Sequence, residues 1–165
     1  LKDCGITEEL PEPFFTFQEN AWSKANYVFE KTGENCFAED SGLVVPALDG
    51  APGVWSARYA GEPSNDENNN QKLLASIKNI SNKSAYYQAV ICLILLGQTH
   101  YFEGKCWGHL TPAPKGDSGF GYDPLFIPDG YNITFAEMNP DLKNQISHRA
   151  KATIQLAAFL NKRPA

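Results

Sequence analysis

The sequence predicts an α/β fold in which helices flank a mixed β-sheet. Two stretches with apolar residues at helical spacing, one near each end of the chain, predict helices that cover a sheet. Between them, residues 86–96 are apolar at both alternating positions, which is typical of a strand buried on both faces. The chain has 165 residues, 42% of them hydrophobic, which is enough for one domain with a sizeable core. We therefore treat residues 1–165 as a single domain.

The first predicted helix begins after Thr16 and ends at Gly33. Thr16 and Glu19 match a capping box, in which the two residues satisfy free amides of the first turn. Gly33 is suited to the left-handed conformation that ends many helices. The predicted buried face consists of apolar residues at helical spacing, namely Phe17, Ala21, Trp22, Ala25, Val28 and Phe29.

A strand, an ordered loop and a second helix follow. The apolar residues 36–38 lead into the sequence EDSGLVV, so we expect a strand whose end presents Glu39 and Asp40 to a cleft. Residues 50–61, GAPGVWSARYAG, are rich in glycine and lack a period, which indicates an ordered loop. Ser64 occupies the cap position of the next predicted helix.

The second half of the chain begins with two strands. The strand at residues 86–96 is followed by a predicted turn at 97–100 and a second strand at 101–110, which would pair with it. Residues 111–128 carry four prolines and three glycines around aromatic residues, so a rigid irregular segment is expected there. Rigid loops of this kind commonly carry binding groups.

The chain is predicted to end in a helix. Asn139 and Pro140 have the residue types of a helix cap and of a first helical position. The predicted buried stripe of this helix runs to the C-terminus and consists of Ala150, Ile154, Ala157 and Leu160.

Composition and charge exclude several classes of function. A net charge of -5 and a pI near 5.2 are not those of a protein that wraps a nucleic acid backbone. No apolar run reaches the roughly 20 residues that span a membrane. Residues 1–10 lack the apolar stretch of a secretory signal, so we expect a cytoplasmic protein. The four cysteines form no CxxC pair and are expected to be free thiols.

Glu39 and Asp40 form the first candidate site. Adjacent carboxylates at the end of a buried strand are costly unless a cation meets them, and beside phosphates that cation is usually Mg²⁺. The alternative is that one carboxylate caps the turn at Ser41 and the other is solvated. Residue types alone leave both readings open. Glu12, in the sequence LPEPFF, has the features of an exposed loop acid.

The segment KGDSGFGYDPLF, residues 115–126, is the second candidate. Its glycines let the backbone approach a ligand, and Phe120 or Tyr122 could stack on a flat ring. Taken alone, the pattern favours a purely structural turn, because Asp123 before Pro124 is a common way to start one.

Lys143, Ser147, His148 and Arg149 form the third candidate. They place several hydrogen-bond donors near a predicted helix start, where backbone amides also favour anions. The alternative is a solvated basic face in which His148 pairs with a carboxylate. From these residues alone, the solvated face is the simpler interpretation.

Six segments, taken in order and spacing, resemble the inosine triphosphate pyrophosphatase family, whose members hydrolyse non-standard purine nucleoside triphosphates. A single matching segment would be weak evidence for the family, because DSG and GFG occur in many proteins, but the ordered set of six is specific. The segments are FQENAWSKA (17–25), AEDSGL (38–43), GAPGVWSARYAG (50–61), GFGYDPLF (119–126), FAEM (135–138) and KNQISHRAKA (143–152).

The resemblance implies an elongated fold with a central mixed sheet, two lobes with a nucleotide cleft between them, and a homodimer. It implies hydrolysis of ITP, dITP and XTP to the monophosphate and pyrophosphate, with Mg²⁺ as cofactor and a purine nucleoside triphosphate as partner. Asp40 would activate the attacking water, and Glu12, Asp40 and Glu39 would be the metal-associated acids. Phe120 would stack on the purine, and the substrate-binding set would be Ser41, Phe120, Gly121, Tyr122, Asp123, Lys143, His148 and Arg149.

The chain departs from the family pattern at its start. Family members begin with a strand and a Ser/Thr-x-x-Asn-x-x-Lys loop that grips the triphosphate, and nothing in residues 1–10 matches that loop. We therefore expect this sequence to be a fragment that lacks the N-terminal strand and the phosphate-binding loop, and to be catalytically weak by itself.

Two other functions compete with this interpretation. A relative that binds nucleotides without turnover would keep the base-binding residues. An aspartic protease is indicated by the triplet Asp-Ser-Gly at residues 40–42. Against the protease, Glu39 replaces the apolar residue expected before that aspartate, and a chain this small would have to dimerise.

Overall fold

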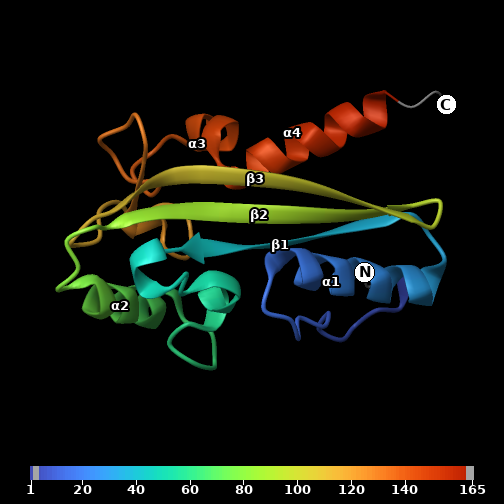
Figure 1. Ribbon diagram of the computed structural model, residues 1–165, viewed down its shortest axis with the longest axis horizontal. Helices are drawn as coiled ribbons and strands as arrows, with labels where there is room; N and C mark the ends of the chain where they lie inside the picture. The colour runs from blue at the N-terminus through green and yellow to red at the C-terminus, as the bar shows by residue number, and fades with distance from the viewer. Residues whose placement is uncertain (2–3, 163–165) are drawn as a thin grey trace.

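An antiparallel four-stranded sheet forms the centre of the molecule (Figure 1). The structure is a computed structural model, and it describes Leu1 and residues 4–162. β2 and β3 run along the long axis, so the molecule is elongated (Figure 1). In sheet order, the strands are β1 (Cys36–Val44), β2 (Ser84–Leu95), β3 (Gln98–Leu110) and β4 (Phe126–Pro128).

The predicted α/β class with flanking helices is confirmed. All three pairings between the described strands are antiparallel, so the described part of the chain contains no parallel pairing of the expected mixed sheet. The connection from β2 to β3 is shorter than the predicted turn at 97–100. Leu96 and Gly97 have φ values of 52° and 74°, which suit a two-residue hairpin turn, and β3 therefore begins at Gln98.

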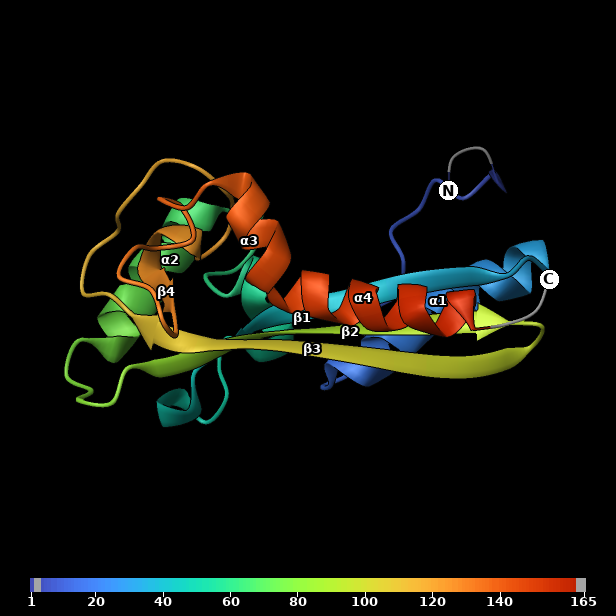
Figure 2. The ribbon, with the colours of Figure 1, turned by 90° about the horizontal axis from the view of Figure 1, so that it is seen from above.

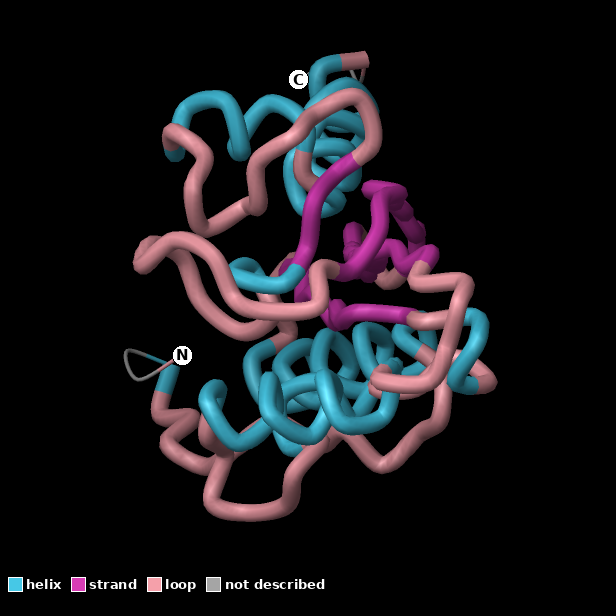
Figure 3. Tube along the Cα trace, turned by 90° about the vertical axis from the view of Figure 1, so that its left-hand side faces the viewer, coloured by secondary structure: helices cyan, strands magenta, loops and turns pink. Residues whose placement is uncertain are grey.

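Helices cover both faces of the sheet (Figure 3). α1 (Phe17–Thr32) packs on β1 and β2, and α4 (His148–Asn161) runs along β2 and β3 on the opposite face (Figure 2). Successive side chains of a strand point to opposite faces, so alternate residues of β2 pack against α1 and against α4. Val90, Cys92 and Ile94 pack with α1, and Ala89, Ile91 and Leu93 pack with α4. The prediction of a strand buried on both faces is confirmed.

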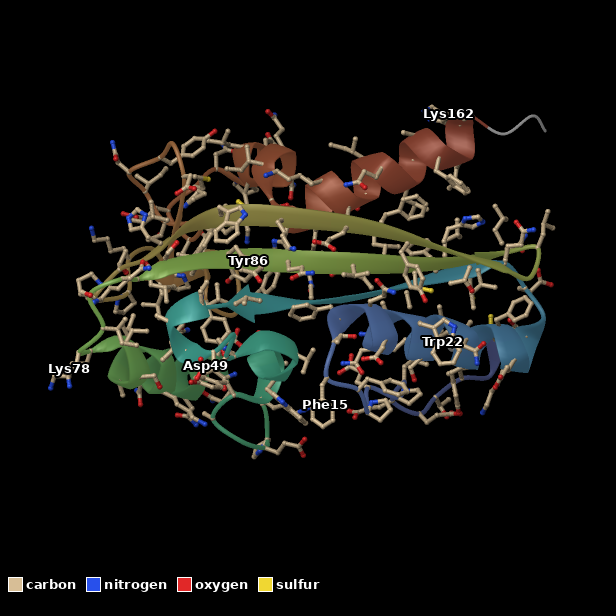
Figure 4. The ribbon with its side chains drawn as sticks, viewed as in Figure 1. Phe15, Trp22, Asp49, Lys78, Tyr86 and Lys162 are labelled. Carbon is tan, nitrogen blue, oxygen red and sulfur yellow. The ribbon has the colours of Figure 1, made fainter. Side chains whose placement is uncertain are left out.

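The ends of α1 are those predicted from the sequence. The Thr16 side chain accepts a hydrogen bond from an amide of the first turn, and Gly33 has a left-handed backbone with a φ of 70°. The predicted buried face is wrong at Trp22, which is 37% exposed (Figure 4), because only a narrow stripe of the helix faces the sheet. Two polar residues, Asn20 and Lys24, are buried there instead.

The segment between β1 and β2 contains two short 3₁₀ turns, Pro46–Leu48 and Gly53–Arg58, and the helix α2 (Asp66–Ile77). The predicted cap at Ser64 is wrong by one residue. The Asn65 side chain accepts the hydrogen bond from the first turn of α2, whereas the Ser64 hydroxyl donates to a carbonyl of the preceding loop.

The final helical region consists of two helices. α3 (Pro140–Ile146) ends at Ser147, whose extended backbone, with a ψ of 160°, interrupts the helix. The Ser147 side chain then caps α4 by accepting a hydrogen bond from the Ala150 amide. The break places His148 and Arg149 in the first turn of a new helix.

The predicted buried stripe of α4 is wrong. Ala152 and Leu156 are buried against the sheet with Phe159 beside them, whereas Ile154 and Leu160 are 62% and 43% exposed. The reason is that apolar residues occur on every side of this helix, so their spacing alone cannot select the face that meets the sheet. Of the other predicted members, Ala150 is half-buried and Ala157 is exposed.

A third core cluster supports the irregular segment that follows β3. Its aromatic rings pack closely, with centroids 4.9 Å apart for Tyr87 and Phe126 and 5.1 Å apart for Phe126 and Phe135. Tyr122 and Leu125 of the irregular segment are buried in the same cluster. Within residues 4–162, none of the helices combines the length and the apolar character needed to cross a membrane.

Candidate active site

β1 directs its two neighbouring acids to opposite faces of the sheet. Asp40 shares the α1 face with Ala38 and Val44, and the alternation of a strand sends Glu39 and Ser41 to the α4 face. Asp40 is 8% exposed. We expected these acids at the end of a strand, but they lie in its middle, because β1 continues to Val44.

Lys24 joins Asp40 to Glu12. Its Nζ lies 3.0 Å from Oδ1 of Asp40 and 2.6 Å from Oε1 of Glu12. Arg58, from the loop after β1, lies 3.8 Å from the other carboxylate oxygen of Glu12. The expectation that Glu12 is a plain exposed loop acid is therefore wrong, since two cations hold it beside Asp40.

Lys24 is a candidate that sequence reasoning missed. A signal was present, because Asn20 and Lys24 lie one turn apart on the buried face of α1, and polar residues are rarely buried unless they are paired. The Asn20 amide accepts a hydrogen bond from the Phe14 nitrogen at 2.9 Å and donates one to the Phe14 oxygen at 3.2 Å. These two bonds fix the loop that carries Glu12.

The second carboxylate oxygen of Asp40, Oδ2, is buried and has no hydrogen-bond partner among the described residues. Burial raises the pKa of Asp40 above its usual value, and the nearby Lys24 opposes that rise. A buried oxygen without a partner is suited to accept a hydrogen bond from a water molecule or to bind a cation.

Asp40 and Glu12 together fit a Mg²⁺ ion, because this cation prefers carboxylate oxygens and usually keeps several water or phosphate ligands. The part of the chain that the structure describes contains no group of three or more acidic, histidine or cysteine side chains placed to hold a metal. Protein ligands would therefore be few. The metal role of Glu39 stays a prediction.

Arg149 connects the acids to the second half of the site. Its Nε donates to Oε1 of Glu39 at 2.7 Å, and its Nη2 donates to Oγ of Ser41 at 3.1 Å. Its guanidinium carbon lies 5.2 Å from the centroid of the Phe120 ring. One side chain at the start of α4 thus contacts β1 on one side and the irregular segment on the other.

Phe120 presents its ring beside two cations. The ring is 58% exposed, and Lys143 Nζ lies 4.8 Å from its centroid. Asp123, which is 2% exposed, accepts a hydrogen bond from the Phe120 nitrogen at 2.9 Å and pairs with Lys143. The turn at Asp123 is therefore structural, and it also orients two of the predicted substrate-binding residues.

His148 is buried against Tyr87, a residue that the sequence analysis did not select. The two rings are stacked, with centroids 4.7 Å apart and an interplanar angle of 9°. Burial, and then the charges of Arg149 and Lys143, lower the pKa of His148 to about 3. The alternative of a solvated, carboxylate-paired His148 is wrong, because the imidazole is buried and neutral at physiological pH.

Three cavities gather around Arg149. The largest, of about 490 Å³, is lined by Phe120, Asp123, Lys143, Ser147, His148 and Arg149 among others. A cavity of about 160 Å³ is lined by Ser41, Phe120, Gly121, Tyr122, His148 and Arg149 among others. A cavity of about 210 Å³ is lined by Glu12, Lys24, Glu39, Asp40, Arg58 and Arg149 among others. Every predicted site residue therefore lines a cavity that Arg149 also lines.

Tyr122 is buried beside the site and holds two of its loops together. Its side chain is 3% exposed, and its hydroxyl donates to the Ser56 carbonyl at 2.8 Å. Ser56 in turn donates to the Gly53 carbonyl and accepts from the Leu43 amide. Tyr122 thus ties the irregular segment to the glycine-rich loop after β1.

The geometry does not support the aspartic protease alternative. Such enzymes need two carboxylates that share a proton. The nearest charged partner of Asp40 is the ammonium of Lys24, which also bonds Glu12, so these two carboxylates are bridged by a cation and not by a shared proton.

Comparison with known proteins identifies the family. The Ham1 family model matches residues 1–159. A dITP/XTP pyrophosphatase of Porphyromonas gingivalis is 49% identical over 161 residues, which are 97% of this chain and 83% of that protein. A dITP/XTP pyrophosphatase of Flavobacterium psychrophilum is 47% identical over 96% of this chain and 84% of its own length.

Solved structures agree with this assignment. The Ham1 protein of Staphylococcus aureus is similar with a TM-score of 0.91 and 38% identity, over 94% of this chain and 81% of that one. A HAM1 protein from Coxiella burnetii gives a TM-score of 0.94 and 36% identity, over 98% of this chain and 84% of that one. The resemblance found in the sequence is confirmed, and this chain belongs to the Ham1 family.

Proposed function

We propose that this protein hydrolyses non-standard purine nucleoside triphosphates, namely ITP, dITP and XTP, to the monophosphate and pyrophosphate. Relatives named dITP/XTP pyrophosphatase support the substrate class. The observation that carries the proposal is the placement of Arg149 between two cavities. One holds the exposed Phe120 ring and suits a flat base, and the other holds Lys24 and Asp40 and suits a phosphate chain.

Asp40 would act on the water that attacks the α-phosphorus. Its Oδ2 has no partner within the described residues, so it can orient the water and accept its proton as the new P–O bond forms. The bond from the α-phosphorus to the pyrophosphate oxygen breaks, and pyrophosphate leaves with the electron pair. Lys24 holds Asp40 through Oδ1 and places a positive charge where phosphate oxygens gain charge.

We propose Mg²⁺ as the cofactor, with Asp40 and Glu12 as its protein ligands. When bound, Mg²⁺ would offset the charge of the triphosphate and stabilise the leaving pyrophosphate. Both carboxylates line the same cavity, and Lys24 and Arg58 keep Glu12 close to Asp40.

Selectivity for the base would come from donors around the Phe120 ring. Hypoxanthine and xanthine carry a carbonyl at position six, which can accept from Arg149 or Lys143. Adenine carries an amino group there, so a donor would stay unpaired, and a buried mismatch of this kind can discriminate by roughly 10⁴-fold. The neutral imidazole of His148 can accept a hydrogen bond as well as donate one.

Pyrophosphate release from ITP, dITP, XTP, ATP and GTP, with and without Mg²⁺, tests the proposal in the natural protein that carries this chain. We expect faster release from ITP, dITP and XTP than from ATP, and none after Mg²⁺ is chelated. Tight IMP binding in calorimetry without release from ITP would favour a nucleotide-binding relative that lacks turnover. Absence of both binding and release would overturn the two functions together.

We also propose that the protein is a cytoplasmic homodimer. The dimer is supported by the family resemblance. Cys92 and Cys106 are buried free thiols, which are typical of a reducing compartment. Light scattering of the purified protein measures its mass, and a monomer at micromolar concentration would contradict the proposed dimer.

A further inference from the structure

We propose that Asp66 and Asn70 of α2 are positioning residues that aim Phe120 at the base by holding the backbone of Gly121. The inference rests on the proposed function, because it concerns the base-binding loop of that site. Oδ2 of Asp66 accepts a hydrogen bond from the Gly121 nitrogen at 2.7 Å. Nδ2 of Asn70 donates to the Gly121 oxygen at 2.9 Å. Both polar backbone groups of the residue after Phe120 are therefore held by one helix.

Gly121 is held by these two bonds from α2, while the preceding residue, Phe120, is held by the Asp123 carboxylate. The φ of Gly121 is 59°, in the left-handed region that glycine adopts freely. Apart from its two chain neighbours, no described residue comes within 4 Å of the position that a Cβ would take at Gly121. No side chain of Gly121 can anchor it by packing, and a carboxylate such as that of Asp66 is a stronger hydrogen-bond acceptor than a neutral group.

α2 is a suitable anchor for this loop. Asn65 caps its first turn, and Leu73 and Ile77 bury its far end in the core. Asp66 and Asn70 are four residues apart, so they lie on the same side of the helix. The helix thus presents an acceptor and a donor at the spacing of one turn.

The same helix also holds a second loop that lines the cavity of about 160 Å³. Oδ1 of Asn69 accepts from the Ala60 nitrogen at 2.7 Å, and Nδ2 donates to the Ala57 oxygen at 3.0 Å. Ala57 and Phe120 both line the cavity of about 160 Å³. α2 therefore sets the distance between the glycine-rich loop and the Phe120 loop.

The consequence concerns binding and not the chemical step. The Phe120 ring is 58% exposed, so beyond its contacts with Lys143 and Arg149 its direction depends on the conformation of its loop. If the loop already has its binding conformation before the base binds, no conformational entropy of the loop is lost during binding. The base is stacked in both the ground state and the transition state. Loss of the hydrogen bonds to Gly121 should therefore raise KM and leave kcat nearly unchanged.

Alanine substitutions on two matched pairs of α2 residues test this role. Asp66→Ala and Asn70→Ala each remove one bond to Gly121. Glu67→Ala and Gln71→Ala are the controls. These residues have the same spacing, and Nε2 of Gln71 donates to Oε1 of Glu67 at 3.4 Å. Within the described residues, the side chains that bond the Gly121 backbone are those of Asp66 and Asn70.

We expect each positioning variant to raise KM for ITP on the order of tenfold, within the range that base stacking contributes, with kcat changed less than about twofold. The control variants should match the wild type. Asp66→Asn keeps an acceptor oxygen and should recover most of the affinity. Equal KM values in Asp66→Ala and Glu67→Ala would overturn the inference.

Two further measurements separate positioning from general structural damage. In a Phe120→Ala background, Asp66→Ala should raise KM no further, because residues that act through one contact are not additive; full additivity would reject the inference. Hydrogen exchange of the Gly121 amide should accelerate in Asp66→Ala and stay unchanged in Glu67→Ala.

The exchange measurement does not depend on activity. A wild-type protein that fails to hydrolyse ITP would refute the proposed function, whereas equal Gly121 exchange in the wild type and Asp66→Ala would refute the positioning role.

Discussion

Lys24 on α1 and Asp40 in the middle of β1 form an ion pair, with 3.0 Å between Nζ and Oδ1. Both side chains are largely buried, at 11% and 10% exposure. The same ammonium lies 2.6 Å from Glu12, so one cation serves two acids from different segments. The arrangement keeps Asp40 in place while its second oxygen stays available for chemistry.

Replacement of Lys24 by methionine should destabilise the protein and nearly abolish its activity. The variant leaves the buried Asp40 charge without its partner, which costs on the order of 3 kcal/mol of unfolding free energy. We expect kcat/KM for ITP to fall by about 100-fold or more, because a charge that meets the phosphates is lost. Urea denaturation and pyrophosphate release measure the two effects. If adding Asp40→Asn to Lys24→Met recovers no stability, the ion-pair explanation fails.

Asp40→Asn should remove turnover and keep nucleotide binding. The amide cannot take a proton from water, so kcat should fall by roughly 10² to 10⁴-fold. Asp40 does not line the cavity around the Phe120 ring, so the affinity for IMP measured by calorimetry should be close to that of the wild type. Asp129→Asn, at an exposed acid, is the control. A variant with near-normal kcat would exclude Asp40 as the base.

Local features were predictable from the sequence, and contacts between distant segments were not. Thr16 caps the start of α1 and Gly33 caps its end through hydrogen bonds to residues nearby in the sequence. The residue types were therefore enough to predict both ends of the helix. The exposure of Trp22 on α1 and the identity of the buried residues of α4 depend on which face of each helix meets the sheet. Apolar residues lie on several sides of these helices, so the sequence does not determine that face.

In the candidate site too, residues in sequence motifs were predictable, whereas residues that act through distant partners were not. The family motifs selected residues that the fold gathers around Arg149. They gave no role to Lys24, Tyr87 or Asp66, because each acquires its role from a partner far along the chain. Lys24 meets Asp40 across the packing of α1 on β1, and Asp66 meets a glycine 55 residues away.

Stability should fall as the pH drops below about 6.5, the usual pKa of histidine, because of His148. Burial together with Arg149, Lys143 and Lys151 lowers its pKa to about 3 in the folded protein. Above the unfolded pKa, both states are neutral at this residue. Between about pH 6.5 and 3, the unfolded chain binds a proton that the folded protein does not, so stability decreases by up to about 1.4 kcal/mol per pH unit.

Urea denaturation of the wild type and of His148→Gln, from about pH 7 to pH 4, isolates this contribution from that of the carboxylates. The variant has no imidazole to protonate, so its stability should depend less steeply on pH. Parallel curves for the two proteins would show that His148 titrates normally in the folded state.

Arg149→Lys should weaken ITP binding and reduce the preference for ITP over ATP. Arginine bonds Glu39 and Ser41 through two different nitrogens, whereas lysine offers a single point of charge and cannot reproduce that geometry. We expect kcat/KM for ITP to fall on the order of tenfold, with a smaller change for ATP. The Arg149 side chain is 45% exposed, so the unfolding free energy should change by no more than about 1 kcal/mol. Lys151→Ala, two residues further along α4, is the control. An unchanged ratio between ITP and ATP would assign recognition of the six-carbonyl to Lys143 instead, because it is the other cation that lies against the Phe120 ring.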